Sequence, residues 1–253
     1  MRIPAIFLLL TSFLLGSLLQ TAPSFATSKR PLRIATQEST APFVMPDRQS
    51  GLSVDIVREA LHLEGYEVTL TFLPSPRMVE ALTTGKIDAA FPLRSSHLND
   101  SIYASDSHIT FSNVAVSLEE NRTTIRNLDD LAKCRVDAFL GASKWLPQEF
   151  RNMAAANPNY AEQNDQKAQV ASFFARRDKV VVLEKHIFEY YAHKGGCNPL
   201  RLRYVIHDIL PPAPLAVAFA DKKLRDAFNS GLRKLRESGR YDVIVRKYVD
   251  GDE

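Results

Sequence analysis

The strongest constraint on the fold is an alternation of strand and helix patterns between residues 32 and 91. Between the strands, apolar residues recur at helical spacing, first in a helix capped by Ser53 and ended by Gly65, then between Pro76 and Gly85. Such an alternation predicts a parallel sheet covered by helices, whose strand ends meet at one edge where ligands bind. The predicted strands are Leu32–Gln37, Val68–Phe72 and Ile87–Phe91.

The pattern restarts after residue 110 and ends in two amphipathic helices over 224–235 and 241–248. The chain therefore divides into two alternating units joined by crossings near 108–112 and 208–215. Paired crossings predict a hinge, with a ligand cleft between the two lobes. The further predicted strands are Thr110–Leu118, Arg135–Leu140, Val180–Leu183, Leu200–Ile206 and Leu215–Phe219, and the further helices are 127–133, 143–155, 166–176 and 185–193.

The first residues have the pattern of a secretory signal peptide. Arg2 precedes a nearly unbroken apolar run to Leu19, and small residues stand at Ser24 and Ala26, which predicts cleavage after Ala26. A retained membrane anchor is the alternative, but the run is slightly short for a span of about 20 residues and small or polar residues interrupt it. No cysteine precedes Cys134, which excludes a lipoprotein anchor. We expect a periplasmic protein.

Charge and cysteine content narrow the partners. The chain has 32 Lys and Arg against 29 Asp and Glu, a balance that argues against nucleic acid. An oxidising compartment favours a disulfide between Cys134 and Cys197, the only two cysteines; two buried free thiols are the alternative. The six histidines are scattered, so we expect no metal site and no cofactor.

Several short segments, weak alone, form a recognisable series in their order and spacing. They are Leu32-Arg-Ile-Ala-Thr, Ala41-Pro42-Phe43, Gly51-Leu-Ser-Val-Asp55, Ala81-Leu-Thr-Thr-Gly-Lys-Ile-Asp88, Ser105-Asp106, Leu128-Asp-Asp-Leu131 and Leu235-Arg-Glu-Ser-Gly-Arg-Tyr. The series resembles the extracellular solute-binding proteins of family 3, which serve bacterial ABC importers, mostly for polar amino acids.

The resemblance implies an α/β fold of the type II periplasmic binding proteins, a two-lobe Venus flytrap that closes on one small ligand. Each lobe is then a mixed, mostly parallel sheet flanked by helices. We expect residues 1–26 to be the signal peptide, 27–109 with 213–253 to form the first lobe, and 110–212 to form the second.

The resemblance also implies ligand-binding positions, and in the first lobe the chain departs from them. Amino-acid binders hold the ligand carboxylate with an arginine where this chain has Leu98, so Arg94, followed by Ser95, is expected to supply the charge. Arg77 corresponds to a second ligand-contacting arginine of acidic-amino-acid binders. Each arginine has an alternative as an ordinary surface residue.

The aromatic residue usually found two before the Pro-Phe step is Thr40 here, which leaves Phe43 as stacking platform or core residue. We place Gln37 at the same edge. In the second lobe, Gly141 and Ser143 match a Gly-Thr-Thr-like turn that grips an anion, unless Ser143 is only an N-cap. The acidic residue that holds a ligand ammonium falls at Leu183 or at Glu184.

Together with these residues, the resemblance implies a monomeric binding protein, not an enzyme, that captures a small polar or anionic solute in the interlobe cleft for an ABC-type importer, with the importer's inner-membrane permease as partner. One alternative is an exported, dehydratase-like enzyme that uses Glu184, His186, His97 and Ser143 as acids and bases. Another is an accessory protein of a periplasmic complex with a degenerate cleft.

Overall fold

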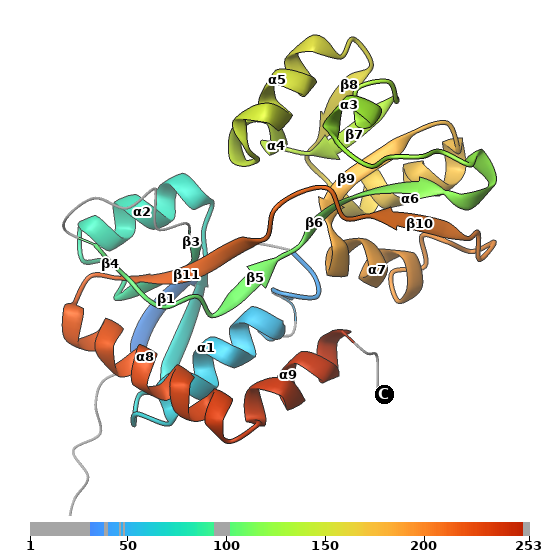
Figure 1. Ribbon diagram of the computed structural model, residues 1–253. Helices are drawn as coiled ribbons and strands as arrows, with labels where there is room; N and C mark the ends of the chain where they lie inside the picture. The colour runs from blue at the N-terminus through green and yellow to red at the C-terminus, as the bar shows by residue number, and fades with distance from the viewer. Residues whose placement is uncertain (1–30, 38–39, 46, 48, 94–101, 250–253) are drawn as a thin grey trace, which may run out of the picture.

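The computed structural model describes residues 31–37, 40–45, 47, 49–93 and 102–249. The predicted signal peptide and the predicted ligand residues Arg94 and Ser95 lie outside these ranges. Figure 1 shows two α/β lobes joined by extended chain, which is the predicted two-lobe architecture.

The first lobe is built on a sheet with the strand order β2-β1-β3-β11-β4, in which β5 also pairs with β11. Strand β1 is parallel to both β2 and β3, whereas β11 returns antiparallel to β3. The strands are β1 (Leu32–Thr36), β2 (Val68–Phe72), β3 (Ala89–Leu93), β4 (Tyr103–Ala104), β5 (Ile109–Phe111) and β11 (Ala213–Phe219). The helices are α1 (Leu52–His62), α2 (Ser75–Thr83), α8 (Lys222–Glu237) and α9 (Arg240–Val249).

The second lobe has a five-stranded sheet in the order β10-β6-β9-β7-β8. Its parallel strands β7, β8 and β9 alternate with helices, while β6 and β10 are antiparallel. The strands are β6 (Asn113–Leu118), β7 (Val136–Phe139), β8 (Tyr160–Gln163), β9 (Val180–Glu184) and β10 (Tyr204–His207). The helices are the 3₁₀ turn η3 (Glu119–Asn121), α3 (Leu128–Leu131), α4 (Ala142–Trp145), α5 (Gln148–Ala156), α6 (Gln166–Arg176) and α7 (Lys185–His193).

The two crossings between the lobes run side by side. Strand β5 pairs antiparallel with β11, with Ile109 opposite Leu215 and Phe111 opposite Ala213. The first crossing leads from β5 into β6, and the second leads from β10 back into β11, as the crossing strands in Figure 1 show. A narrow two-stranded connection lets two rigid sheets rotate relative to each other.

The predicted helix over 143–155 is two helices, because Pro147 interrupts it. Leu146, the residue before the proline, takes an extended conformation with φ −82° and ψ 167°, as proline demands of its neighbour. Ser53 is not the cap of α1: Gly51 stands at that position with no side-chain cap. The sequence pattern did not predict the edge strand β8, which carries Glu162.

The predicted disulfide is wrong: both Cys134 and Cys197 are free thiols. The second sheet separates them. Cys197 belongs to the apolar cluster that includes α6 and α7 and one face of this sheet, whereas Cys134 packs against the cluster that includes α5 and the opposite face. Burial raises the pKa of both thiols, so neither is an activated thiolate.

None of the helices within the described ranges is both long and apolar enough to cross a membrane.

Candidate ligand-binding site

The strand ends of the two lobes meet at the hinge through three aromatic side chains. Phe43, which follows β1, has its ring centroid 4.6 Å from that of Phe111 in β5 and 6.1 Å from that of His186 in α7. Phe43 is buried, so its ring is already covered by protein on these sides. It connects the first lobe, the hinge and the second lobe.

A glycine and the C-terminal helix hold the Phe43 turn in place. Gly51 has a φ of +136°, and a Cβ atom at this position would lie 2.3 Å from the carbonyl oxygen of Phe43. The amide of Ser53 donates to that same carbonyl at 3.1 Å. The amide of Gly51 donates to the hydroxyl of Tyr248 at 3.2 Å, and this hydroxyl in turn donates to Asp55. No larger residue fits at position 51 without moving the turn.

Glu184 lies at the end of β9, buried against the hinge. Its carboxylate accepts hydrogen bonds from the amides of Ile187 at 3.0 Å and Ser112 at 3.3 Å, and it pairs with Nδ1 of His186 at 3.0 Å. It therefore caps α7 and ties this helix to the crossing strand. Burial lowers the pKa of His186, but the hydrogen bond and charge of Glu184 outweigh burial and raise it above the ordinary value.

The turn Gly141–Ser143, predicted to grip an anion, holds a carboxylate of the protein itself. The amide and the hydroxyl of Ser143 donate to Oε1 of Glu162 at 2.9 and 2.7 Å, and the amide of Gly141 donates to Oε2 at 2.7 Å. The hydroxyl of Tyr160 adds a fourth hydrogen bond at 2.8 Å. In this structure the group that Ser143 contacts is therefore Glu162 of β8.

The electrostatics of this turn favour an ionised Glu162. Burial raises the pKa of the Glu162 carboxyl, but the hydrogen bonds from Ser143, Gly141 and Tyr160 outweigh it and hold the pKa below its usual range. Burial and the same carboxylate raise the pKa of Tyr160, which stays a neutral donor. At neutral pH Glu162 is therefore a carboxylate and Tyr160 a neutral phenol that donates to it.

The remaining predicted residues lie on the first lobe. Arg77 is exposed on the first turn of α2, and within the described ranges its guanidinium has no hydrogen-bond or ion-pair partner. Gln37 follows β1 and is half-buried. The structure adds Thr36 beside it, fully buried, whose Oγ1 has no partner among the described residues. Sequence patterns could not single it out, because a buried threonine in a strand is common.

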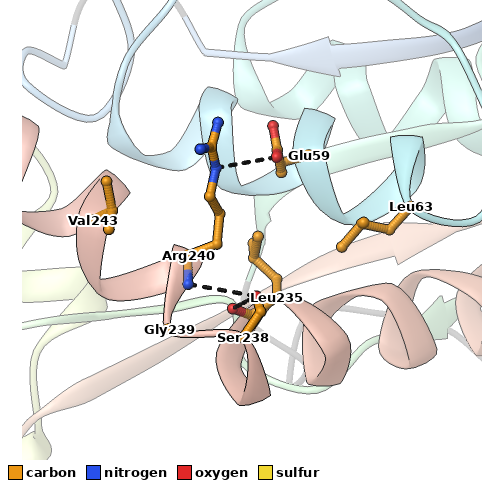
Figure 2. Close-up of a pocket in the computed structure, with 7 residues that line it drawn as sticks. All are labelled: Glu59, Leu63, Leu235, Ser238, Gly239, Arg240 and Val243. Atoms are coloured by element: carbon orange, nitrogen blue, oxygen red, sulfur yellow. Dashed lines mark hydrogen bonds and ion pairs between the residues drawn. The ribbon is translucent and has the colours of Figure 1, made fainter.

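Two pockets of the protein are lined by residues other than the aromatic side chains at the hinge. One of about 380 Å³ lies between α1 and the turn joining α8 to α9, where Arg240 crosses it to pair with Glu59 at 3.3 Å (Figure 2). Another of about 550 Å³ is lined by basic residues before β7 and β9, such as Arg135, which pairs with Asp178. None of the predicted ligand residues within the described ranges lines either pocket. Within the described residues, no cluster of three His, Cys, Asp or Glu side chains could hold a metal ion.

Solved structures with the same fold cover most of the chain. The GluR0 ligand-binding core in complex with L-glutamate superposes with a TM-score of 0.72 at 15% identity, covering 88% of this chain and 99% of that one. The P235GK mutant of ArgBP from T. maritima gives 0.66 at 21% identity, covering 86% and 94%. AncCDT-1, an ancestral amino acid-binding protein and precursor of cyclohexadienyl dehydratase, gives 0.66 at 21%, covering 87% and 95%. At these identities the likeness shows the fold.

No curated protein sequence matches the chain. Residues 32–251 match the family model for bacterial extracellular solute-binding proteins, family 3, a span that includes both sheets and the hinge. The two sheets, the paired crossings and this match agree, and the chain belongs to the bacterial extracellular solute-binding proteins of family 3.

Proposed function

We propose that this protein is a periplasmic solute-binding protein that captures a small polar or anionic solute between its lobes and delivers it to an ABC-type importer. The observation that carries the proposal is the β5–β11 hinge, at which the two lobes meet through Phe43 and His186. A solute that contacts both lobes favours the closed arrangement by its extra affinity for it. Family membership supports the binding role.

Arg77 is the ligand contact that we propose from the first lobe, together with Arg94 and Ser95. The exposed guanidinium of Arg77, which has no partner among the described residues, can donate two parallel hydrogen bonds to a carboxylate or phosphate. Glu184 offers a buried negative charge at the other side of the hinge, although three protein donors already satisfy it. Gln37, Phe43, Gly141 and Ser143 complete the proposed surroundings of the solute.

Thermal unfolding with a library of small metabolites tests the proposal, because a ligand that binds only the native state raises the melting temperature. We expect one class of polar or anionic solute to stabilise the protein, and small-angle scattering to show a more compact molecule with it. Arg77→Ala should remove this shift. Arg246→Ala, which removes an exposed arginine of α9, should not. A library without any hit would contradict solute capture and favour a degenerate cleft.

An enzymatic role is supported by one observation, the pairing of His186 with Glu184 near the hinge. Such a pair could move a proton, and one solved relative is a precursor of cyclohexadienyl dehydratase. The amides of Ser112 and Ile187 occupy the Glu184 carboxylate, however, which makes it a better structural cap than a free base. If the protein consumes its solute over hours and Glu184→Gln stops this consumption, an enzymatic role is established.

A further inference from the structure

Glu162 is gripped by a set of donors that come from two separate segments. The amides of Gly141 and Ser143 and the Ser143 hydroxyl come from the turn after β7, and the Tyr160 hydroxyl comes from β8. Three of the four donors converge on Oε1 and one on Oε2. Backbone amides, a serine hydroxyl and a phenol are the groups with which proteins bind a carboxylate or a phosphate.

The chain around these donors is built to keep them pointing at one place. Gly141 has a φ of +84°, and a Cβ atom there would lie 2.5 Å from Nε1 of Trp145. At the other end of α4, Arg151 donates to the carbonyl of Ser143 at 3.1 Å. The short helix is therefore held by a negative side chain at its start and a positive one near its end, which matches its dipole. The donors do not need a ligand to be oriented.

We propose that Glu162 determines specificity in the second lobe: its carboxylate fills the turn Gly141–Ser143 and excludes the carboxylate of a solute from it. This inference rests on the proposed function, because it assigns the class of solute that the site accepts. An anionic group of the solute is then held by the first lobe alone. The solute's other end then carries no carboxylate, because it faces a turn whose donors are occupied and the neighbouring Leu140, which is 58% exposed.

The exclusion follows from competition between a tethered and a free group. Glu162 is fixed in β8, paired in register with Ala138 of β7, so its carboxylate stays beside the donors. A tethered group acts at an effective concentration of millimolar or more, and higher when it is pre-oriented. The carboxylate of a solute at micromolar concentration therefore competes poorly with Glu162 for these donors. An amino acid held by its carboxylate in this turn is accordingly a poor ligand.

Chemical rescue tests the proposal without knowledge of the natural solute. Glu162→Ala empties the turn but leaves its donors, so we expect a lower melting temperature that sodium acetate partly restores. At 100 mM acetate the variant should gain about 3 °C more than the wild type, the shift for a ligand at roughly ten times its Kd. Asp165→Ala is the matched control, because it removes a carboxylate that caps α6 through the amide of Ala168 alone.

An acetate shift confined to Glu162→Ala supports the proposal. A shift of equal size in the wild type or in Asp165→Ala overturns it, because acetate then acts on the protein generally. If the alanine variant does not fold, the wild type provides the measurement by amide NMR. The Gly141 and Ser143 amide resonances should then move together with one midpoint below the usual range of glutamate, and amides that do not respond to acid would contradict the proposal.

The rescue also separates this inference from the proposed function. Acetate binding to the emptied turn does not require that the wild type bind any solute. A metabolite library without hits would therefore overturn solute capture while acetate rescue still succeeded. Conversely, a wild type stabilised by amino acids, with stabilisation abolished in Ser143→Ala, would establish solute capture and overturn the role assigned to Glu162.

Discussion

The hydroxyl of Ser53 in α1 lies 2.6 Å from Nε2 of His108, the residue that leads into the hinge strand β5, and both side chains are fully buried. The other ring nitrogen, Nδ1, has no partner among the described residues. The backbone of His108 is also fixed: its amide donates to Leu215 and its carbonyl accepts from the Tyr241 hydroxyl at 2.9 Å. His108 thus anchors the first lobe to the start of the crossing.

The first prediction concerns pH. Burial lowers the pKa of His108 to about 3, so the folded protein keeps the imidazole neutral while the unfolded chain protonates near 6.5. The unfolded state then binds the extra proton, and stability that is fully present above pH 6.5 is lost as the pH falls toward 3. The slope from this group is about 1.4 kcal/mol per pH unit. Urea unfolding between pH 7 and pH 4 measures it.

His108→Asn serves as the control, because asparagine can keep a hydrogen bond to Ser53 but does not titrate. Its unfolding free energy should be lower at pH 7 and should depend less on pH between 7 and 4. A variant with the same slope as the wild type would show that other groups cause the acid sensitivity.

The second prediction concerns the contact between α1 and α8. A Cβ atom on Gly231 would lie 1.9 Å from the carbonyl oxygen of Ala60, a distance that no rotamer can relieve. Gly→Ala within an exposed helix is worth about 1 kcal/mol in favour of folding. Here we expect Gly231→Ala to destabilise by about 2 kcal/mol instead, because the helices must move apart. Urea unfolding gives the sign directly.

Two further variants serve as controls for Gly231→Ala. Adding Ala60→Gly should not restore stability, since the obstructing atom belongs to the backbone. Lys223→Ala, on the exposed face of α8, should change stability little. A stabilised Gly231→Ala would contradict the close approach of the two helices.

The periodic elements could be predicted from the sequence because their apolar spacing is strong, as in α1 and β9, where buried residues dominate. Strand β8 could not, because Tyr160 to Gln163 is a short edge strand with two exposed residues and little apolar alternation. Because β8 was not predicted, the role of Glu162 was not predicted either. The resemblance implied that the turn Gly141–Ser143 holds an anion, but the group that fills the turn in the structure comes from a strand about twenty residues away.

The partners of single side chains also depended on distant parts of the chain. Ser53 is a residue type that commonly caps helices, yet its hydroxyl hydrogen-bonds with His108, which comes from another part of the chain. The resemblance to family 3 pointed to Leu183 or Glu184 as the acidic residue, and in the structure Glu184 is the N-cap of α7. Local signals therefore predicted where polar residues gather, while long-range packing decided their partners.

The third prediction concerns the ion pair between Lys179 and Asp137, each side chain only 6% exposed. Lys179 also donates to Ser172 at 2.9 Å, whereas Oδ1 of Asp137 has no partner among the described residues. Removing one partner leaves a buried charge alone, so Lys179→Met should cost about 3–5 kcal/mol. The double variant Asp137→Asn with Lys179→Met should cost less than the sum of the single variants. A double-mutant cycle in urea measures this coupling, and additive effects would contradict it.

The last prediction concerns the cysteines. Because the second sheet lies between Cys134 and Cys197, we expect dithiothreitol to leave the melting temperature of the purified protein unchanged. Thiol titration in denaturant without reductant should find two free thiols per chain. In the native protein the same reagent should react slowly, because burial raises the pKa of both groups and Cys197 is almost inaccessible. A melting temperature that falls with reductant would mean that the chain does bridge these residues, which would require the sheet to rearrange.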